Sequence, residues 1–386
     1  MSKNILFLLG SYPSYGGVEK VTTILANEFD KRGYKVSIVS FEQPNPELGD
    51  MELAPTISLY KLSYPVCTRK NIDALRRIIE ADQVQYLINQ WCVPFYVVRL
   101  IKKATKGIDC KTIAVHHNLP TVNARIKEIE FRLENGSGNI FVNKIQLWGV
   151  QLFSRLSLRY AYDVSDAFVV LSHLFISITN GHIFKSKGSR IWAISNPLTI
   201  ENSMNVWTKQ KEIIYVGRIE YNQKRVFRVV DAWKEVQNHY PDWCLTIVGD
   251  GPDRGLLKKR IEDRGIDRVV ITGFTNPQIY YERASVLLLT SEFEGFGLVI
   301  IEGMSYGVVP IVYGSYPSVY DIIESGMNGF VTDVPYTQSE TVKYLRVLMD
   351  NPVLLEKMSQ NAKESLCRFS ADAVVKQWED LFKSLQ

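Results

Sequence analysis

The sequence contains no apolar run that approaches the ~18–20 residues a membrane-spanning helix needs, so an integral helical membrane protein is not expected. Its first apolar segment, residues 5–9, has about half the length of a secretory apolar core, and Tyr12 and Pro13 follow it closely. This segment therefore predicts a first buried strand and not a leader sequence.

Cysteine is scarce as well. The five cysteines are odd in number, far apart and without C-x-x-C spacing, so they predict neither a disulfide framework nor a zinc site. Reduced thiols of this kind favour a cytoplasmic protein. With 46% hydrophobic and 22% charged residues, the composition is that of a globular chain and excludes a disordered or fibrous one.

The formal net charge is only +4, but it is unevenly distributed. Residues 1–195 hold 24 Lys+Arg against 16 Asp+Glu, a balance of +8, and residues 196–386 hold 21 against 25, a balance of −4. A basic half favours an anionic partner. An unevenly solvated surface is the other interpretation of the same balance.

The 386 residues are enough for two to three domains at ~150 residues each. Strand, Gly-rich loop, helix and strand follow one another over residues 4–41, which predicts a right-handed parallel crossover. The alternation restarts after Asn196-Pro197. We therefore expect an α/β protein made of two Rossmann-like doubly wound domains that face a cleft. The first would span residues 1–196 and the second residues 197–369, with a last helix at about 370–386 packing back on the first.

Ligands of such sheets bind beyond the carboxyl ends of the strands, and residues 291–303 form the most informative of these strand ends. A predicted strand runs into a turn with Gly295 and Gly297, and this turn opens a helix. The free amides at a helix start attract anions, and glycine lets the backbone approach a phosphate closely. Glu294 and Glu302 flank the turn and can accept hydrogen bonds from hydroxyls on both sides of a diphosphate. Alternatively, Glu294 is only a helix-start acid and Glu302 a solvated helix residue.

Three further strand ends carry polar or glycine-rich loops. Arg218 and Lys224 follow one predicted strand and can both reach one diphosphate across a short loop. Gly249 lies in the tight loop 248–252, and Phe274 ends the segment 272–274, whose backbone can lie beside a nucleotide base. Their appearance at successive strand ends favours one common nucleotide site over scattered surface residues.

These motifs, in this order, resemble those of a known family. G-R-x5-K (217–224), V-G-D-G-P (248–252) and E-G-F-G-x4-E (294–302) together are similar to the motifs of the retaining nucleotide-sugar glycosyltransferases of the GT-B fold, family 4, also called glycosyl transferases group 1. Gly16-Gly17-Val18-Glu19, His116-His117 and the connector 195–198 are similar too. The resemblance covers nearly the whole chain, and the C-terminal motifs are the more specific ones.

The resemblance implies roles for individual residues. Arg218 and Lys224 match the pair that neutralises the donor diphosphate, Glu294 the glutamate that holds donor-sugar hydroxyls, and Glu302 the glutamate that binds ribose. The remaining positions implied for donor binding are Gly16, Gly17, Gly249, Phe274, Gly295, Phe296, Gly297 and Leu298. The family histidine that bonds the transferred sugar would be His116 or His117; strand alternation points only one of them into the cleft, and we favour His117.

The resemblance also implies the chemistry. A retaining, metal-independent transfer would move a sugar from a nucleotide-sugar, with UDP-sugar favoured over GDP-sugar, to a glycan or lipid-linked acceptor in cell-surface polysaccharide assembly. The nucleotide-sugar is a substrate, so no cofactor is implied, and no Asp-x-Asp metal motif lies in these loops. Two routes for the transfer stay open. In one, the acceptor attacks from the same face and the diphosphate oxygen accepts its proton; in the other, a covalent intermediate forms. Asp321 stands where many members have glutamate, which leaves the donor choice near the loop 314–321 open.

Residues 125–159 depart most from the α/β alternation. The helical pattern over 143–160 mixes Lys144, Arg155 and Arg159 with apolar residues that include Trp148. Such a helix can lie at an anionic membrane surface, which would make the enzyme peripheral on the cytoplasmic face. The other interpretation is a core helix whose apolar side packs on the sheet.

Other functions remain as alternatives. A GT-B sugar-nucleotide epimerase would share the cleft and transfer nothing, and a non-catalytic nucleotide-sugar-binding module would not need the four residues Arg218, Lys224, Glu294 and Glu302 together. A nicotinamide dehydrogenase is disfavoured because Gly10 and Gly16 lack the G-x-G-x-x-G spacing. Nucleic-acid binding is disfavoured because the sequence contains no nucleic-acid-binding motif.

Overall fold

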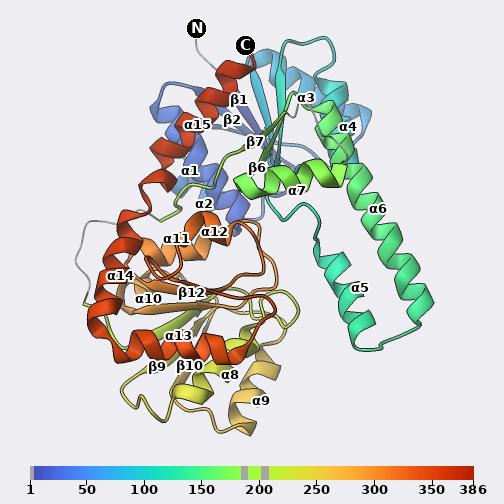
Figure 1. The fold of residues 1–386 in the computed structure, drawn as a ribbon. Helices are drawn as coiled ribbons and strands as arrows, with labels where there is room; N and C mark the ends of the chain where they lie inside the picture. Colours follow the sequence, from blue (N-terminus) through green and yellow to red (C-terminus); the bar gives the residue numbers. More distant parts are fainter. Residues whose placement is uncertain (1–3, 184–189, 201–207) are drawn as a thin grey trace. The chain divides into compact units, whose positions relative to one another are not determined.

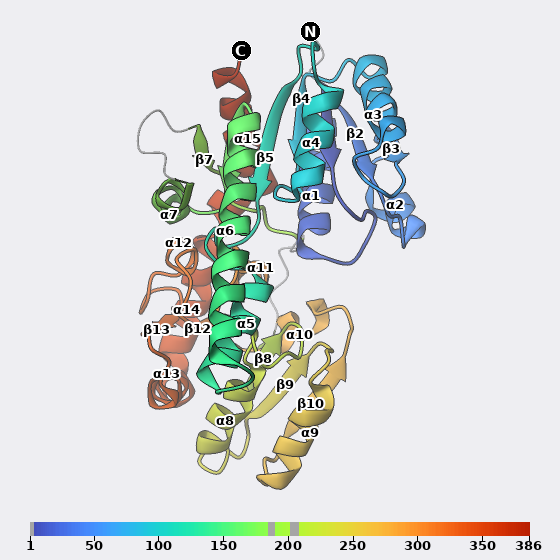
Figure 2. The same cartoon turned by 90° about the vertical axis from the view of Figure 1, so that its right-hand side faces the viewer.

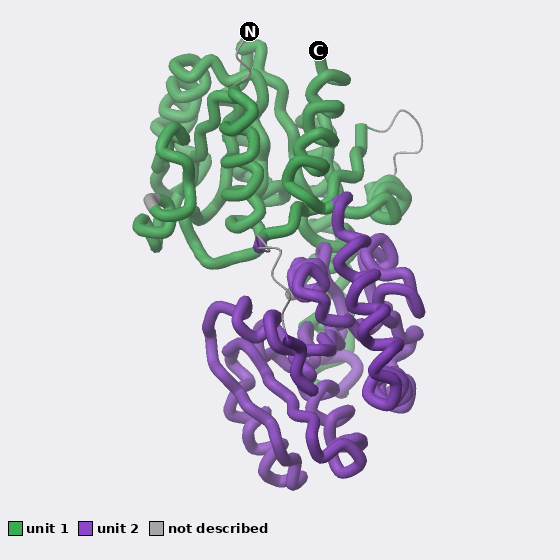
Figure 3. Tube along the Cα trace, turned by 90° about the vertical axis from the view of Figure 1, so that its left-hand side faces the viewer, with its two compact units in different colours: residues 1–129, 136–199, 369–386 green, residues 130–135, 200–368 purple. Residues whose placement is uncertain are grey.

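The computed structural model describes residues 4–183, 190–200 and 208–386 and divides them between two compact units (Figure 3). Unit 1 comprises residues 1–129, 136–199 and 369–386, and unit 2 comprises residues 130–135 and 200–368. After Asn196-Pro197 the sequence has a polar stretch over 201–212, and part of it, residues 201–207, lies outside the described residues. Since each unit has its own sheet and its own core, we describe them one at a time.

Unit 1 is built on a seven-stranded parallel sheet with the order β3-β2-β1-β4-β5-β6-β7 (Figure 1). Its strands are β1 (Asn4–Leu8), β2 (Lys35–Ser40), β3 (Ser58–Lys61), β4 (Tyr86–Asn89), β5 (Lys111–His116), β6 (Ala167–Val170) and β7 (Ile191–Ala193). Every residue of β1, β4 and β6 is buried, as expected of strands covered by helices on both faces. The fold class predicted for this half is confirmed.

Eight helices of the described chain belong wholly or in part to unit 1. They are α1 (Gly17–Lys31), α2 (Pro46–Glu52), α3 (Arg69–Ala81), α4 (Phe95–Ala104), α5 (Ala124–Glu134), α6 (Ile140–Val164), α7 (His173–Ile183) and α15 (Ala371–Ser384). The 25-residue α6 is the longest helix of the described chain (Figure 2), and it packs against α4 and α7. It begins after Asn139, whose side chain accepts hydrogen bonds from the amides of Phe141 and Val142.

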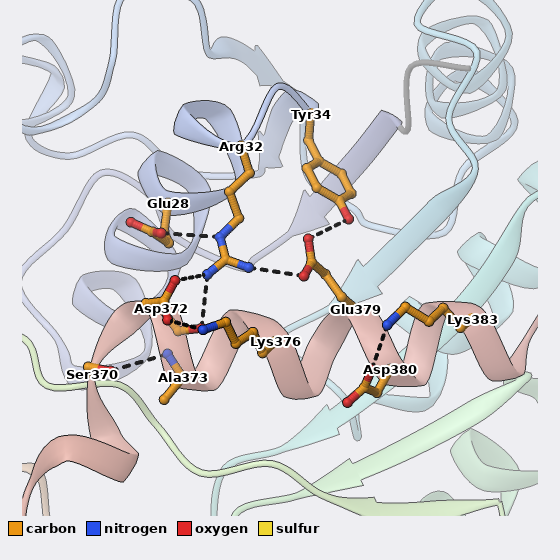
Figure 4. Close-up of polar contacts among 10 residues, drawn as sticks. All are labelled: Glu28, Arg32, Tyr34, Ser370, Asp372, Ala373, Lys376, Glu379, Asp380 and Lys383. Carbon is orange, nitrogen blue, oxygen red and sulfur yellow. Dashed lines mark hydrogen bonds and ion pairs between the residues drawn. The ribbon is translucent and has the colours of Figure 1, made fainter.

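The chain returns to unit 1 through α15, which packs against α1. Figure 4 shows Arg32 joining the two: its guanidinium binds Glu28 of α1 at 3.2 Å and Glu379 of α15 at 3.0 Å, and it also donates to Asp372. Beneath these ion pairs, the fully buried Phe382 stacks on Tyr86 with ring centroids 4.1 Å apart. Because burial of aromatic area dominates core energetics, α15 is part of the core of unit 1.

Unit 2 repeats the architecture with a six-stranded parallel sheet, in the order β10-β9-β8-β11-β12-β13. Its strands are β8 (Glu212–Val216), β9 (Cys244–Val248), β10 (Val269–Gly273), β11 (Val286–Leu289), β12 (Val309–Tyr313) and β13 (Phe330–Thr332). Its helices are α8 (Val226–Val236), α9 (Arg254–Asp263), α10 (Gln278–Arg283), α11 (Leu298–Ser305), α12 (Val319–Ile322), α13 (Gln338–Asp350) and α14 (Pro352–Glu364). The connection back to α15 includes a short 3-10 helix, Cys367–Phe369.

Both sheets reverse their strand order at one point, between β1 and β4 in unit 1 and between β8 and β11 in unit 2. Loops that follow the two central strands therefore separate in opposite directions, and a crevice opens at the carboxyl ends of these strands. Gly16 and Gly17 follow β1, and the loops with Arg218, Lys224 and Glu294 follow β8 and β11. The other predicted site residues lie at the ends of neighbouring strands, namely His116 and His117 at β5, Gly249 at β9 and Phe274 at β10. Among the described helices, none is long and apolar enough to cross a membrane.

Candidate nucleotide-sugar site

The loops that follow β8 and β11 are joined in unit 2. Lys224 Nζ lies 2.6 Å from Glu294 Oε1, and the side chain of Gln223 donates to the carbonyl of Phe293 at 3.2 Å. The amide of Glu292 donates to the carbonyl of Gln223 at 2.8 Å. Two predicted donor residues that are 70 positions apart in the sequence thus meet at the point where the strand order reverses. Because the side chains of Lys224 and Glu294 are only 22% and 12% exposed, their charges are only partly screened by solvent.

A second set of ion pairs fixes the same two loops and was missed from the sequence. Glu292 accepts from Arg225 at 3.1 Å and from Arg228 at 2.7 Å. The hydroxyl of Thr290 donates to the carbonyl of Arg225 at 2.9 Å. Arg225 itself has a φ of 50°, an uncommon conformation for a residue with a side chain. These contacts hold Lys224 and Glu294 in place. The only signal for them in the sequence was that Arg225 lies next to Lys224 and Glu292 lies close to Glu294.

The glycines of the V-G-D-G motif are required by a close approach of two backbones. A Cβ at Gly249 would lie 1.9 Å from the carbonyl oxygen of Gly217, and a Cβ at Gly251 would lie 2.2 Å from that of Ile219. Gly249 also has a φ of 149°. Only glycine fits both constraints, so the loop after β9 is packed tightly against the loop that carries Arg218.

The turn after β11 forms the start of helix α11. Gly297 precedes α11 with a φ of 95°, which favours glycine, and a Cβ there would lie 2.8 Å from Ile300 Cδ1. Gly295 and Phe296 precede it, Phe296 is buried, and Leu298 is the first residue of the helix. The first amides of an α-helix have no partner within the helix, and the helix dipole is positive at this end, so this turn can receive phosphate oxygens.

Glu302 is not the solvated residue that the alternative interpretation required. It is 6% exposed and accepts a hydrogen bond of 3.1 Å from the hydroxyl of Tyr281. Burial, together with the nearby Glu302 carboxylate, raises the pKa of Tyr281 well above its ordinary value, so the tyrosine stays a donor. The hydrogen bond between Tyr281 and Glu302 therefore joins α10 to α11 in the interior of unit 2.

Two predicted donor residues lie at the edge of this site. The side chain of Arg218 is 69% exposed, and its nearest acidic neighbour is Glu220 at 3.9 Å. Phe274 is 72% exposed at the end of β10. Gly249 connects the two loops, because it pairs with Gly273 in an isolated bridge and packs against Gly217. The structure therefore brings the unit 2 residues of the predicted set to one edge of one sheet, with Lys224 and Glu294 in direct contact and Arg218 and Phe274 outermost.

Unit 1 has its own cavity, of about 680 Å³, at the carboxyl ends of β4 and β5. Both His116 and His117 line it, as does Val18, which follows Gly16 and Gly17 at the start of α1. The expectation that strand alternation would point only one histidine toward the site does not hold for this cavity. The reason is that β5 ends at His116, so alternation no longer governs His117.

The two histidines are held as neutral rings. His117 Nε2 lies 2.6 Å from Gln90 Oε1, an oxygen that can only accept, so this nitrogen carries the proton. Burial, and then the neighbouring His116, lowers the pKa of His117 to about 3; burial, and then His182, lowers that of His116 to about 4. Within the described chain, three buried atoms at this cavity have no hydrogen-bond partner: His117 Nδ1, His116 Nε2 and Gln90 Nε2. Such atoms are able to bind substrate hydroxyls.

Gln90 and Trp91 were missed from the sequence, although they follow a predicted strand. A Cβ at Gly10 would lie 2.9 Å from the Trp91 ring, so the indole packs directly on the loop after β1. Asn89 holds this turn, because its side-chain oxygen accepts from the amides of Trp91 and Cys92. The signal available was the position of an amide and an aromatic residue just beyond the strand 85–89.

The comparisons with known proteins agree with this architecture. Two family models match successive parts of the chain: Glycosyltransferase Family 4 over residues 15–200 and Glycosyl transferases group 1 over residues 199–365. An uncharacterized glycosyltransferase of Haemophilus influenzae is 26% identical over 390 residues, covering 98% of this chain and 99% of that protein. An alpha-1,4-N-acetyl-D-galactosaminyltransferase of Campylobacter jejuni, named for a glycan on PP-undecaprenol, is 22% identical and covers 99% of each chain.

A solved structure extends the likeness to the fold. TarM of S. aureus, crystallised in complex with Fondaparinux, alpha-GlcNAc-glycerol and UDP, has a TM-score of 0.77 at 14% identity, over 98% of this chain and 99% of that one. The two family matches meet at residue 200, near the boundary between the units, and leave only the ends of the chain uncovered. The chain therefore belongs to the group 1, or family 4, glycosyltransferases and has their GT-B fold.

Proposed function

We propose that this glycosyltransferase moves a sugar from a UDP-sugar to a glycan or lipid-linked acceptor, with retention of the anomeric configuration and without a metal ion. The observation that carries the proposal is the meeting of Lys224 with Glu294 beside the start of α11. Each of these groups at one sheet edge matches one part of a donor. The cation matches the diphosphate, the helix start matches the leaving oxygen, and the carboxylate matches the sugar hydroxyls.

In this proposal the protein stabilises the departing diphosphate. Charge develops on the diphosphate oxygens as the bond to the sugar breaks, and Lys224, Arg218 and the first amides of α11 are the groups that can receive it. Glu294 and Glu302 act as hydroxyl acceptors that position the donor. They are not a glycosidase acid and base pair, since the acceptor proton would pass to the leaving diphosphate.

The unit 1 cavity supports the acceptor half of the proposal. Its unpartnered ring nitrogens and the amide of Gln90 offer two acceptors and a donor for hydroxyl groups, and the low pKa values keep both rings neutral at pH 7. The relative in Campylobacter jejuni, whose name includes PP-undecaprenol, supports a lipid-linked acceptor for this chain as well. Such acceptors are held in a membrane, so we place the reaction at its cytoplasmic face.

A donor panel tests the proposal. Purified protein is mixed with UDP- and GDP-sugars, and the melting temperature is recorded for each, since a ligand of the folded state raises it. The best donor is then incubated with a glycan acceptor in EDTA, and the anomeric configuration of the product is read by NMR. We expect an α-linked product from an α-linked donor. A free epimerised sugar nucleotide would instead identify an epimerase, and an inverted product or loss of activity in EDTA would remove those parts of the proposal.

A further inference from the structure

Helix α6 carries an apolar surface that nothing in the described chain covers. Eight of its large hydrophobic side chains are between 38% and 75% exposed, with Phe141, Ile145, Trp148 and Phe153 the most open. We call this set the α6 apolar face: Ile140, Phe141, Val142, Ile145, Trp148, Leu152, Phe153 and Leu156. Exposed apolar area of this extent on one element marks a site of interaction.

The spacing of four of these residues makes a continuous stripe, and the other four flank it. Phe141, Ile145, Trp148 and Leu152 follow each other at intervals of four, three and four, so they lie within about 60° of each other around the helix. The residues that α6 buries are different ones: Asn143, Ser157, Leu158, Ala161 and Tyr162. The interpretation of this segment as a core helix packed through its apolar side is therefore wrong for this face.

The charge on α6 itself is mostly positive, since Lys144, Arg155 and Arg159 stand against the single acid Asp163, which pairs with Arg159. The preceding helix α5 carries the exposed acids Glu128 and Glu134. Residues 135–162 contain no Asp or Glu, and Lys144 is exposed beside the stripe. Helix α4, which packs against α6, contributes three more exposed cations and no acid: Arg99, Lys102 and Lys103. The contact between the helices includes Phe95 and Tyr160, whose ring centroids are 4.7 Å apart. This contact lies at Tyr160, so the cations of α4 adjoin the Leu156 end of the stripe. An apolar stripe with cations beside it and at its end is the pattern of a helix that lies in the interface of an anionic bilayer.

We propose that the α6 apolar face docks on anionic phospholipid, with its aromatic side chains among the acyl chains and the cations of α4 and α6 against the headgroups. The proposal deepens the membrane location given under the proposed function and rests on it. A second copy of this chain fits the same face less well. A two-fold contact would place Lys144 and its neighbours against their own copies, with no carboxylate of 135–162 to neutralise them.

The same helix also reaches the unit 1 cavity. Gly149, Val150 and Phe153 line this cavity, and Phe153 is at the same time 67% exposed as part of the α6 apolar face. The rim of the cavity is therefore continuous with the proposed docking surface. An acceptor whose lipid part stays in the bilayer can present its sugars to the unit 1 cavity across this rim, which points to an amphiphilic, lipid-anchored acceptor.

Vesicle flotation of the full chain tests the proposal. We expect binding to vesicles of phosphatidylcholine with phosphatidylglycerol, weaker binding to phosphatidylcholine alone, and loss of binding as salt is raised. Trp148→Glu should lower the bound fraction by about tenfold or more, because it places a charge where docking would bury a large apolar side chain in the bilayer. The matched control is Leu256→Glu on α9, a leucine that is 60% exposed in unit 2, and it should float like the wild type.

A second variant separates docking from misfolding. Trp148→Phe keeps an apolar ring, so it should float like the wild type but lose the blue shift of tryptophan fluorescence that vesicles induce in the wild type. Both Trp148 variants should keep the melting-temperature rise caused by a UDP-sugar. Failure of the wild type to float, or wild-type flotation of Trp148→Glu, overturns the docking surface. So does a lipid-free dimer that Trp148→Glu converts to monomer. If the chain floats but UDP-sugars do not change its melting temperature, the proposed function is refuted and the docking surface is not.

Discussion

Replacement of Lys224 by methionine is the most direct perturbation of the donor site. Methionine keeps most of the apolar stem and removes the charge, so the loops after β8 and β11 keep their Arg225–Glu292 contact. We expect weaker binding of both UDP and a UDP-sugar, since Lys224 is assigned to the diphosphate that the two ligands share. Glu294→Gln should weaken the UDP-sugar alone, because Glu294 is assigned to the sugar.

The expected magnitude follows from exposure. Lys224 is 22% exposed and Arg218 is 69% exposed, so solvent screens Arg218 more strongly. A hydrogen bond to a charged group contributes about 1.5–3 kcal/mol, so Lys224→Met should raise the Kd by about 10- to 100-fold. Arg218→Met should cost less than about 1 kcal/mol, or about fivefold in Kd, as exposed charge pairs do.

Isothermal titration calorimetry with UDP and then with a UDP-sugar measures these constants. Lys211→Met is the control, since Lys211 lies at the opposite end of β8 and pairs with Asp242, and it should bind like the wild type. The double variant Lys224→Met, Glu294→Gln separates contact from repulsion, because it removes the carboxylate that Lys224→Met leaves unpaired. Weak binding of UDP should persist in the double variant. Recovery of UDP affinity there, or an unchanged affinity in Lys224→Met, would refute a direct contact between Lys224 and the diphosphate.

Three predictions concern stability. Gly249→Ala should lower the free energy of unfolding by about 3 kcal/mol, because the added methyl group overpacks the loop and the φ is unfavourable for alanine. The control Gly255→Ala on α9, where a Cβ meets nothing within 4 Å, should not lower it. Equal denaturant midpoints for the two variants would contradict the backbone contact. Phe382→Ala should cost about 3–5 kcal/mol if α15 belongs to the core of unit 1, and chemical denaturation with a near-wild-type midpoint would argue otherwise. The free energy of unfolding should fall as the pH drops from 6.5 toward 4, because the unfolded chain gains protons that a His117 with a pKa of about 3 does not bind. His117→Asn should make this dependence shallower, and an unchanged slope would count against the buried neutral ring.

The sequence predicted the two sheets and the donor loops because short-range patterns encode them. Buried parallel strands are continuous apolar runs, and the glycines at 249 and 297 mark backbones that only glycine can adopt. The contacts of Arg225 and Arg228 with Glu292 could not be predicted, since they join residues more than 60 positions apart. They exist because the order of the strands places β8 next to β11, and no local pattern contains that order.

Other features depended on where an element or a partner ends. The edge strands β3, β7 and β13 have only three or four residues each, too few for a periodicity to show. Helix α6 has a recognisable apolar side, but periodicity is the same whether that side meets a core or a lipid. The burial of Glu302 likewise depends on Tyr281, which the sheet brings to it from a different helix.

The contribution of α15 to unit 1 has a consequence for biosynthesis. The polypeptide leaves unit 1 at residue 199 and comes back only at residue 369, after nearly all of unit 2 has been made. Until the segment 371–384 emerges from the ribosome, Phe29 and Tyr86 lack the ring that covers them, and Arg32 lacks Glu379. The core of unit 1, which is synthesised first, therefore stays incomplete until the last helix has been made. Unit 2, apart from residues 130–135, can be completed from one continuous stretch. A nascent chain arrested before residue 371 should consequently expose an apolar patch on unit 1 that chaperones recognise, although unit 2 is already folded.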